Sequence, residues 1–193
     1  MTEISIDIER LMKAIDDSSR TIASLSSKVD KIEVIITVII HALKSGCKIL
    51  TAGNGGSAAE ALHMAEELVG RFRANRVSLP AIALVADSTV LTCIGNDFGF
   101  DRIFSRQVEG LGKPGDVLVL FSTSGKAPNL KHALESAHTR GVKTVCVLGR
   151  DGGALVGQGD YEIVVEGSET ERIQEAHQVL IHLMLDAIEE AYT

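Results

Sequence analysis

One stretch of the sequence combines a glycine-rich turn with two side chains that can do chemistry. The turn reads GNGGS over residues 53–57, and His63 and Glu67 follow it in the same segment. Glycines between a strand and a helix let the backbone approach a ligand, and the N–H groups that open the helix favour an anion. Because His63 and Glu67 are four residues apart, a helix presents them on one face. The stretch suggests an enzyme that acts on a small phosphorylated molecule.

A second anion-binding loop is expected further along the chain. Ser122-Thr123-Ser124 follows the apolar run 117–121, and Pro128 suits the first turn of the next helix. Hydroxyls and free N–H groups at a helix start make a phosphate site, although a plain serine-rich turn is the alternative. Ligands of open parallel sheets bind beyond the carboxyl ends of the strands, so the two loops are expected to serve one site.

Spacing alone leaves the chemistry of the candidate residues open. His63 and Glu67 suit a metal site, and they suit an ordinary surface contact on an amphipathic helix equally well. Gln174 and His182 lie about 12 Å apart along one helix, so they reach one ion only if another element converges on them. The turn-forming Asp97 suits a sugar hydroxyl or a simple turn. Nucleotide cofactors are not supported, because the GNGGS turn has neither the GxGxxG spacing nor a following GK[ST].

Composition limits the class of protein. The chain has 193 residues, of which 45% are hydrophobic and 23% charged, as expected of one globular domain. A net charge of −7 and the absence of Trp argue against a nucleic-acid partner. Three widely separated cysteines predict reduced core thiols and a cytoplasmic location. No secretory signal or membrane span is expected, since the longest apolar run is too short for a bilayer.

The elements that must position these residues follow from hydrophobic periodicity. Two helices are predicted first, over 3–26 with a weak point at 16–19 and over 29–45, and then short apolar runs alternate with helices. The runs, predicted as strands, are 48–52, 81–85, 117–121, 144–148 and 163–165. The helices between and after them are predicted over 57–72, 88–95, 101–111, 127–140, 153–157 and 169–191. This alternation predicts an α/β fold with a parallel sheet covered on both faces.

The helix predicted over 29–45 is apolar almost all round. Such a helix must be buried on most sides, and a small domain struggles to bury it alone. We therefore expect a subunit interface, with residues 1–45 serving oligomerisation and residues 46–193 forming the ligand-binding core of a single domain.

The combined pattern resembles the phosphoheptose isomerases, sedoheptulose-7-phosphate isomerases with the sugar isomerase (SIS) fold. The matching segments cover roughly residue 46 to the end of the chain and are AGNGGSAAEALHMAEELVGRF, LPAIAL, IGNDFGFDRIFSRQVE, GDVLVLFSTSGKAPN, DGG and RIQEAHQVLIH. The resemblance implies a three-layer αβα sandwich with a five-stranded, flavodoxin-like parallel sheet. It further implies a homotetramer with its active sites near subunit interfaces, and one Zn²⁺ per subunit.

Site residues follow from the same resemblance. The substrate-binding positions are Asn54, Gly55, Gly56, Ser57, Glu67, Asn96, Asp97, Ser122, Thr123, Ser124 and Gln174. The zinc positions are His63, Glu67, Gln174 and His182, and the catalytic pair is Glu67 and His182. The implied reaction converts sedoheptulose 7-phosphate to D-glycero-D-manno-heptose 7-phosphate through an enediol, as the first step of activated heptose synthesis for lipopolysaccharide, capsule or surface layer.

The serine loop departs from the family pattern at one position. Ala127 stands where the family often has serine, a change expected to shift the phosphate contacts, and Lys126 beside it offers a compensating charge.

One alternative function stays open. Non-catalytic SIS adaptors that bind the replication initiator share the glycine turn and the RIQE-type helix, but they lack the full acid/base set. The presence of both Glu67 and His182 favours the enzyme.

Overall fold

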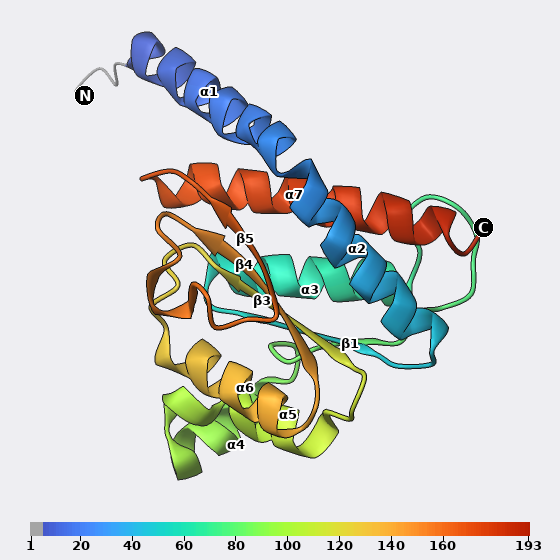
Figure 1. The fold of residues 1–193 in the computed structure, drawn as a ribbon. Coiled ribbons are helices and arrows are strands. Elements are labelled where there is room, and N and C mark those ends of the chain that lie inside the picture. The colour runs from blue at the N-terminus through green and yellow to red at the C-terminus, as the bar shows by residue number, and fades with distance from the viewer. Residues whose placement is uncertain (1–5) are drawn as a thin grey trace.

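The computed structural model describes residues 6–193, and a five-stranded sheet forms its centre (Figure 1). The strands are Ile49–Gly53 (β1), Ala81–Ala83 (β2), Val117–Ser122 (β3), Lys143–Gly149 (β4) and Tyr161–Val165 (β5). They lie in the order β2-β1-β3-β4-β5, and every pairing is parallel. The predicted α/β class and five-stranded parallel sheet are confirmed.

Helices precede, connect and follow the strands. They are Ile8–Ala23 (α1), Val29–Lys44 (α2), Gly56–Val69 (α3), Ser88–Phe98 (α4), Ser105–Leu111 (α5), Pro128–Thr139 (α6) and Thr170–Glu190 (α7). Short 3₁₀ turns occupy Ser24–Lys28, Phe100–Arg102 and Gly153–Leu155. Each predicted helix is present with shifted ends, apart from the short one predicted over 153–157, which is a 3₁₀ turn.

The first predicted helix differs most from expectation. The predicted weak point at 16–19 is wrong, because α1 is continuous there. The hydroxyl of Ser18 donates a hydrogen bond of 2.9 Å to the backbone carbonyl oxygen of Ala14 within the helix. The break comes later, at the 3₁₀ turn of Ser24–Lys28. Residues 3–5 of that predicted helix lie outside the described residues.

The sheet separates two hydrophobic cores. Successive strand residues point to opposite faces, so in β3 Val119 and Phe121 pack with α2, α3 and α7, whereas Leu118 and Leu120 pack with α5 and α6. Figure 1 shows α3 and α7 on one face, and α4, α5 and α6 on the other. Because helices cover both faces of the sheet, the central strands carry apolar side chains on both faces.

α1 extends beyond the body of the molecule (Figure 1). Within residues 6–193 it buries no side chain of its own, and Ile8, Leu11 and Ile15 are 62%, 51% and 65% exposed. α2 packs Ile35 and Ile39 onto the sheet side but leaves Val34 49% exposed. The two helices therefore present apolar surface that a single chain does not cover.

The cysteines are all free, but they are not all core residues. Cys146 is buried in β4, and burial raises the pKa of its thiol to about 12, with Glu162 and Asp160 adding to the effect. The expectation of a core position is wrong for Cys93, because α4 turns Leu91 and Ile94 toward the sheet and leaves Cys93 exposed. None of the helices among residues 6–193 has the length and apolar character needed to cross a membrane.

Candidate active site

The glycine-rich turn joins β1 directly to α3, as its sequence predicts. Gly55 has φ +58°, a conformation that favours glycine, and the helix begins at Gly56. A Cβ at Gly56 would overlap the side-chain amide of Gln174 on α7. The missing side chain at Gly56 is therefore what lets Gln174 lie against the start of α3.

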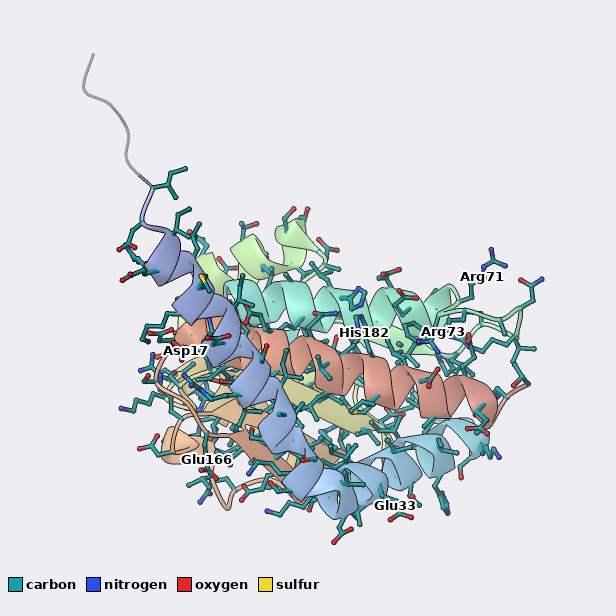
Figure 2. All side chains as sticks on the ribbon, turned by 90° about the horizontal axis from the view of Figure 1, so that it is seen from above. Asp17, Glu33, Arg71, Arg73, Glu166 and His182 are labelled. Atoms are coloured by element: carbon teal, nitrogen blue, oxygen red, sulfur yellow. The ribbon has the colours of Figure 1, made fainter. Side chains whose placement is uncertain are left out.

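Two histidines face each other between α3 and α7. His63 Nε2 lies 3.2 Å from His182 Nε2, although the residues are 119 positions apart in the chain. Figure 2 shows His182 on α7 beside α3. The rings meet edge to face at 5.3 Å between centroids, and the ring of Phe72 lies 5.8 Å from that of His182. α3 and α7 thus converge at these two histidines, which residue spacing alone could not establish.

Carboxylates surround His63. Its Nδ1 lies 3.3 Å from Glu66 Oε1, and one ligand atom from each of His63, Glu66 and Glu67 lies within 4.8 Å of the others. Glu66 is a residue that sequence reasoning missed. Glu66 is three residues after His63, a spacing that places both side chains on one face of a helix, but exposed carboxylates with that spacing are common on helices.

This donor set suits zinc. Two ligand nitrogens on a tetrahedral Zn²⁺ are about 3.3 Å apart, given Zn–N bonds of about 2.0–2.1 Å, and the facing Nε2 atoms are 3.2 Å apart. Gln178 Nε2 also lies 3.2 Å from His182 Nε2. His63 and Gln178 therefore both approach the same nitrogen of His182.

Gln174 occupies a neighbouring position on the same side of the sheet. It lines a surface cavity of about 600 Å³ together with His63. The remaining lining residues are Gly56, Ala59, Glu60, Glu171, Glu175 and Gln178. The cavity opens between the first turns of α3 and α7, so His63 and Gln174 face the same space from two helices.

The serine loop is tightly built around its own hydrogen bonds. Ser122 is buried, and its Oγ accepts from the N–H of Gly125 at 2.9 Å, while Ser124 Oγ accepts from the N–H of Lys126 at 3.3 Å. Gly125 has φ +59°, and a Cβ there would overlap the carbonyl oxygen of Gly152. Thr123 and Ser124 are half-buried, so their side chains are the accessible hydroxyls of this loop.

An amide pair connects the two loops. Asn54 and Asn129 each donate from Nδ2 to the other's Oδ1 at 2.9 Å. Asn129 is buried at the start of α6 and was not among the predicted residues. The pairing holds the glycine turn after β1 beside the loop after β3, and it occupies the Asn54 side chain that the resemblance assigns to the sugar.

Asn96 and Asp97 lie elsewhere in this chain. They were predicted to follow a helix that ends at residue 95, but α4 continues to Phe98 and carries both in its last turn. Asn96 donates to Asp97 Oδ1 at 2.8 Å, and both are exposed. α4 covers the opposite face of the sheet from α3 and α7 (Figure 1), so the substrate role of this pair stays a prediction.

The loop after α3 is held from the C-terminal end of α7. The carboxylate of Glu189 accepts from the backbone N–H groups of Phe72 at 3.2 Å, Arg73 at 2.9 Å and Ala74 at 2.9 Å. Burial acts to raise the pKa of Glu189, but these hydrogen bonds and the nearby Arg76 guanidinium outweigh it and hold the pKa below its usual range. Figure 2 shows Arg71 and Arg73 in this loop.

Comparison with known proteins identifies the family to which the chain belongs. Residues 14–149 match the model of the SIS domain. A phosphoheptose isomerase of Citrifermentans bemidjiense is 49% identical over 158 residues, which cover 82% of each chain. The chain belongs to the phosphoheptose isomerase family of SIS-domain proteins.

Solved structures of this family have the same fold. A phosphoheptose isomerase from Francisella tularensis superimposes with a TM-score of 0.93 at 31% identity, covering 96% of this chain and 100% of that one. The phosphoheptose isomerase from Neisseria gonorrhoeae gives a TM-score of 0.87 at 40% identity, covering 94% and 98%. More than nine tenths of the chain therefore has the fold of these isomerases.

Proposed function

We propose that this protein is an isomerase that interconverts sedoheptulose 7-phosphate and D-glycero-D-manno-heptose 7-phosphate. The observation that carries the proposal is the 3.2 Å approach of His63 and His182 between α3 and α7, with a ligand atom of Glu67 within 4.8 Å of one of His63. The phosphoheptose isomerases to which the chain is similar support it across most of the sequence. They do not favour the alternative of a non-catalytic adaptor.

The reaction moves a proton between neighbouring carbons of the sugar through an enediol. Glu67 takes the proton from one carbon and returns it to the other, and His182 exchanges protons with the substrate oxygens. Groups of this kind each contribute about 10²–10⁴-fold in rate. Binding of the phosphate at the far end orients the reacting carbons toward Glu67.

His63, Glu67, Gln174 and His182 would hold one Zn²⁺ per subunit. Imidazole and carboxylate groups are ligands that zinc accepts, and the 3.2 Å between the Nε2 atoms of His63 and His182 suits two ligands of one ion. When bound, the ion supplies a Lewis acid that polarises the carbonyl of the substrate. Glu66 lies near enough to His63 to orient its ring through Nδ1.

The substrate would lie between the two loops at the carboxyl ends of β1 and β3. Thr123 and Ser124 offer accessible hydroxyls to the phosphate, while Ser122 braces the loop and keeps its own O–H to donate. The backbone of Gly55 and Gly56 would line the sugar, and Ser57, which is buried at the start of α3, would help to hold the phosphate. Lys126 is exposed next to Ala127 and can supply charge where the family has a serine.

The assembly is proposed to be a homotetramer built through α1 and α2. Exposed Ile8, Leu11 and Ile15 on α1 and Val34 on α2 form apolar surface that another copy would cover. The free thiols suit a cytoplasmic enzyme of heptose synthesis.

The direct test is an isomerase assay with the purified protein. Incubation with sedoheptulose 7-phosphate should yield the aldose heptose 7-phosphate. The Glu67→Gln variant should lose about 10²–10⁴-fold in kcat while keeping its melting temperature and oligomeric mass. Activity of Glu67→Gln at the wild-type level would overturn the assignment of the carbon proton, and absence of product with the wild-type protein would overturn the function.

A further inference from the structure

A buried polar pair lies at the wall of the cavity between α3 and α7, with Glu60 among the lining residues. Glu60 is 5% exposed and His177 is 0% exposed. His177 Nδ1 lies 3.4 Å from Glu60 Oε2, and its Nε2 lies 3.2 Å from the carbonyl oxygen of Leu148 in β4. Three elements that are distant in the sequence thus meet at one imidazole ring.

The protonation of the ring follows from its partners. A carbonyl oxygen only accepts, so Nε2 of His177 carries a hydrogen and donates it to Leu148. One proton then lies between Nδ1 and Glu60 Oε2, either on the ring or on the carboxyl group. In both cases the contact is a hydrogen bond that connects α3 with α7.

This pair is costly for the fold. Glu60 Oε1 is buried and has no hydrogen-bond partner among the described residues, and an unsatisfied buried acceptor is destabilising. Replacement of a buried ionic pair by apolar residues of similar size is often neutral or stabilising. Stability therefore does not explain why a carboxylate and an imidazole occupy this position, beside apolar Phe121 at 6.4 Å between ring centroids.

The position of the pair in the helices suggests its use. Glu60 comes one helical turn before His63 on α3, and His177 comes one turn after Gln174 on α7. A displacement of either helix along its axis at this contact would separate His63 from His182, whose Nε2 atoms are 3.2 Å apart. The Leu148 carbonyl anchors the contact to the sheet.

We propose that Glu60 and His177 are positioning residues, whose hydrogen bond sets the spacing of α3 and α7 and so holds the two halves of the active site in register. The inference rests on the proposed roles of His63, Glu67, Gln174 and His182. Neither member of the pair needs to touch the substrate.

The test uses the full-length protein and two variants of the pair. Glu60→Met keeps roughly the length of the side chain but removes the carboxylate that pairs with His177, and the double variant Glu60→Leu/His177→Leu replaces the pair by apolar groups. For each, kcat and KM for sedoheptulose 7-phosphate, the dissociation constant of Zn²⁺ and the melting temperature are measured. We expect Zn²⁺ affinity and kcat each to fall about 10-fold or more in both variants, with KM within about 2-fold. The double variant should have an unchanged or higher melting temperature.

Asp116 provides the matched control, because it is also buried but lies at the opposite end of the sheet. Its carboxylate accepts from the N–H groups of Lys48 at 2.9 Å and Lys113 at 2.8 Å. Asp116→Asn should lower the melting temperature and leave kcat and Zn²⁺ affinity unchanged.

Three outcomes are distinguishable. Wild-type kcat and Zn²⁺ affinity in Glu60→Met would overturn the positioning role, and this variant remains informative if the double variant does not fold. Equal losses of kcat in Glu60→Met and in Asp116→Asn would also overturn it, since they would reflect general stability. Absence of product with the wild-type protein in the same assay would instead overturn the proposed function.

Discussion

Arg76 donates a hydrogen bond of 2.6 Å from Nη2 to the backbone carbonyl oxygen of Glu67, the residue to which we assign the carbon proton. Its Nη1 also donates to the carbonyl of Leu68 at 2.9 Å, and its Nε lies 3.7 Å from Glu189 Oε1. The last carbonyls of a helix have no partner within the helix. Arg76 supplies that partner here, so the backbone of Glu67 is held by the loop that Glu189 orders.

The carboxylate of Glu189 predicts a dependence of stability on pH. Because its pKa is lowered in the folded protein, the charged form adds stability above the pKa of an unfolded glutamate, about 4.3. That contribution is lost as the pH falls through the lower folded pKa. Glu189→Gln should therefore lower the melting temperature at pH 7, by about 2–4 °C for each kcal/mol lost, and the difference from wild type should vanish in acid.

The exposed neighbour Glu190 serves as control for this measurement. Glu190→Gln removes the same charge without touching the loop, so its melting curves should follow the wild type at each pH. A constant difference between Glu189→Gln and wild type down to pH 2 would contradict the role of the ionised carboxylate.

Removal of metal should abolish isomerisation. Dialysis against a chelator is expected to reduce the activity of the wild-type protein to background, and added Zn²⁺ should restore it. His182→Ala should bind Zn²⁺ at least about 10-fold more weakly, because one of the two facing imidazoles is lost. Metal content by mass spectrometry and activity after readdition measure both effects; full activity in metal-free protein would rule out the zinc proposal.

A methyl group at Gly56 should disturb the site without unfolding the protein. The Cβ would overlap the end of the flexible Gln174 side chain, which can rotate away at small cost. Gly56→Ala should keep its melting temperature and lose about 10-fold or more in Zn²⁺ affinity and kcat. Gly110→Ala is the control, because the position has open space around it, and it should match the wild type in melting temperature, Zn²⁺ affinity and kcat. If Gly56→Ala also matches the wild type in Zn²⁺ affinity and kcat, Gln174 has no role in the site.

A charge on the apolar face of α1 should break the assembly. Leu11→Asp and Ile15→Asp place a carboxylate on surface that we assign to another subunit, and burial of an unpaired charge there is unfavourable. Light scattering after size exclusion should show a mass below the tetramer. Asp16→Lys, on the polar side of the same helix, should leave the mass unchanged. Wild-type mass for both aspartate variants would exclude this face from the interface.

The sequence alone determined the class of fold and the identity of most chemical groups. Alternating apolar runs and helices indicate a parallel α/β sheet because strand period and helix period are local properties of the chain. The glycine and serine loops were recognisable for the same reason, since turn chemistry involves few consecutive residues. The family resemblance then named His63, Glu67, Gln174 and His182 before any geometry was known.

Only the tertiary structure decided which of these groups meet. His63 and His182 are 119 residues apart and touch because α3 and α7 pack on one face of the sheet. The same packing creates contacts that local pattern does not encode, among them Glu60 with His177, at a separation of 117 residues. Sequence periodicity says which face of a helix is buried, but the position of one helix along another depends on the side chains between them. The position of α7 along α3 therefore decides whether His63 and His182 form one site.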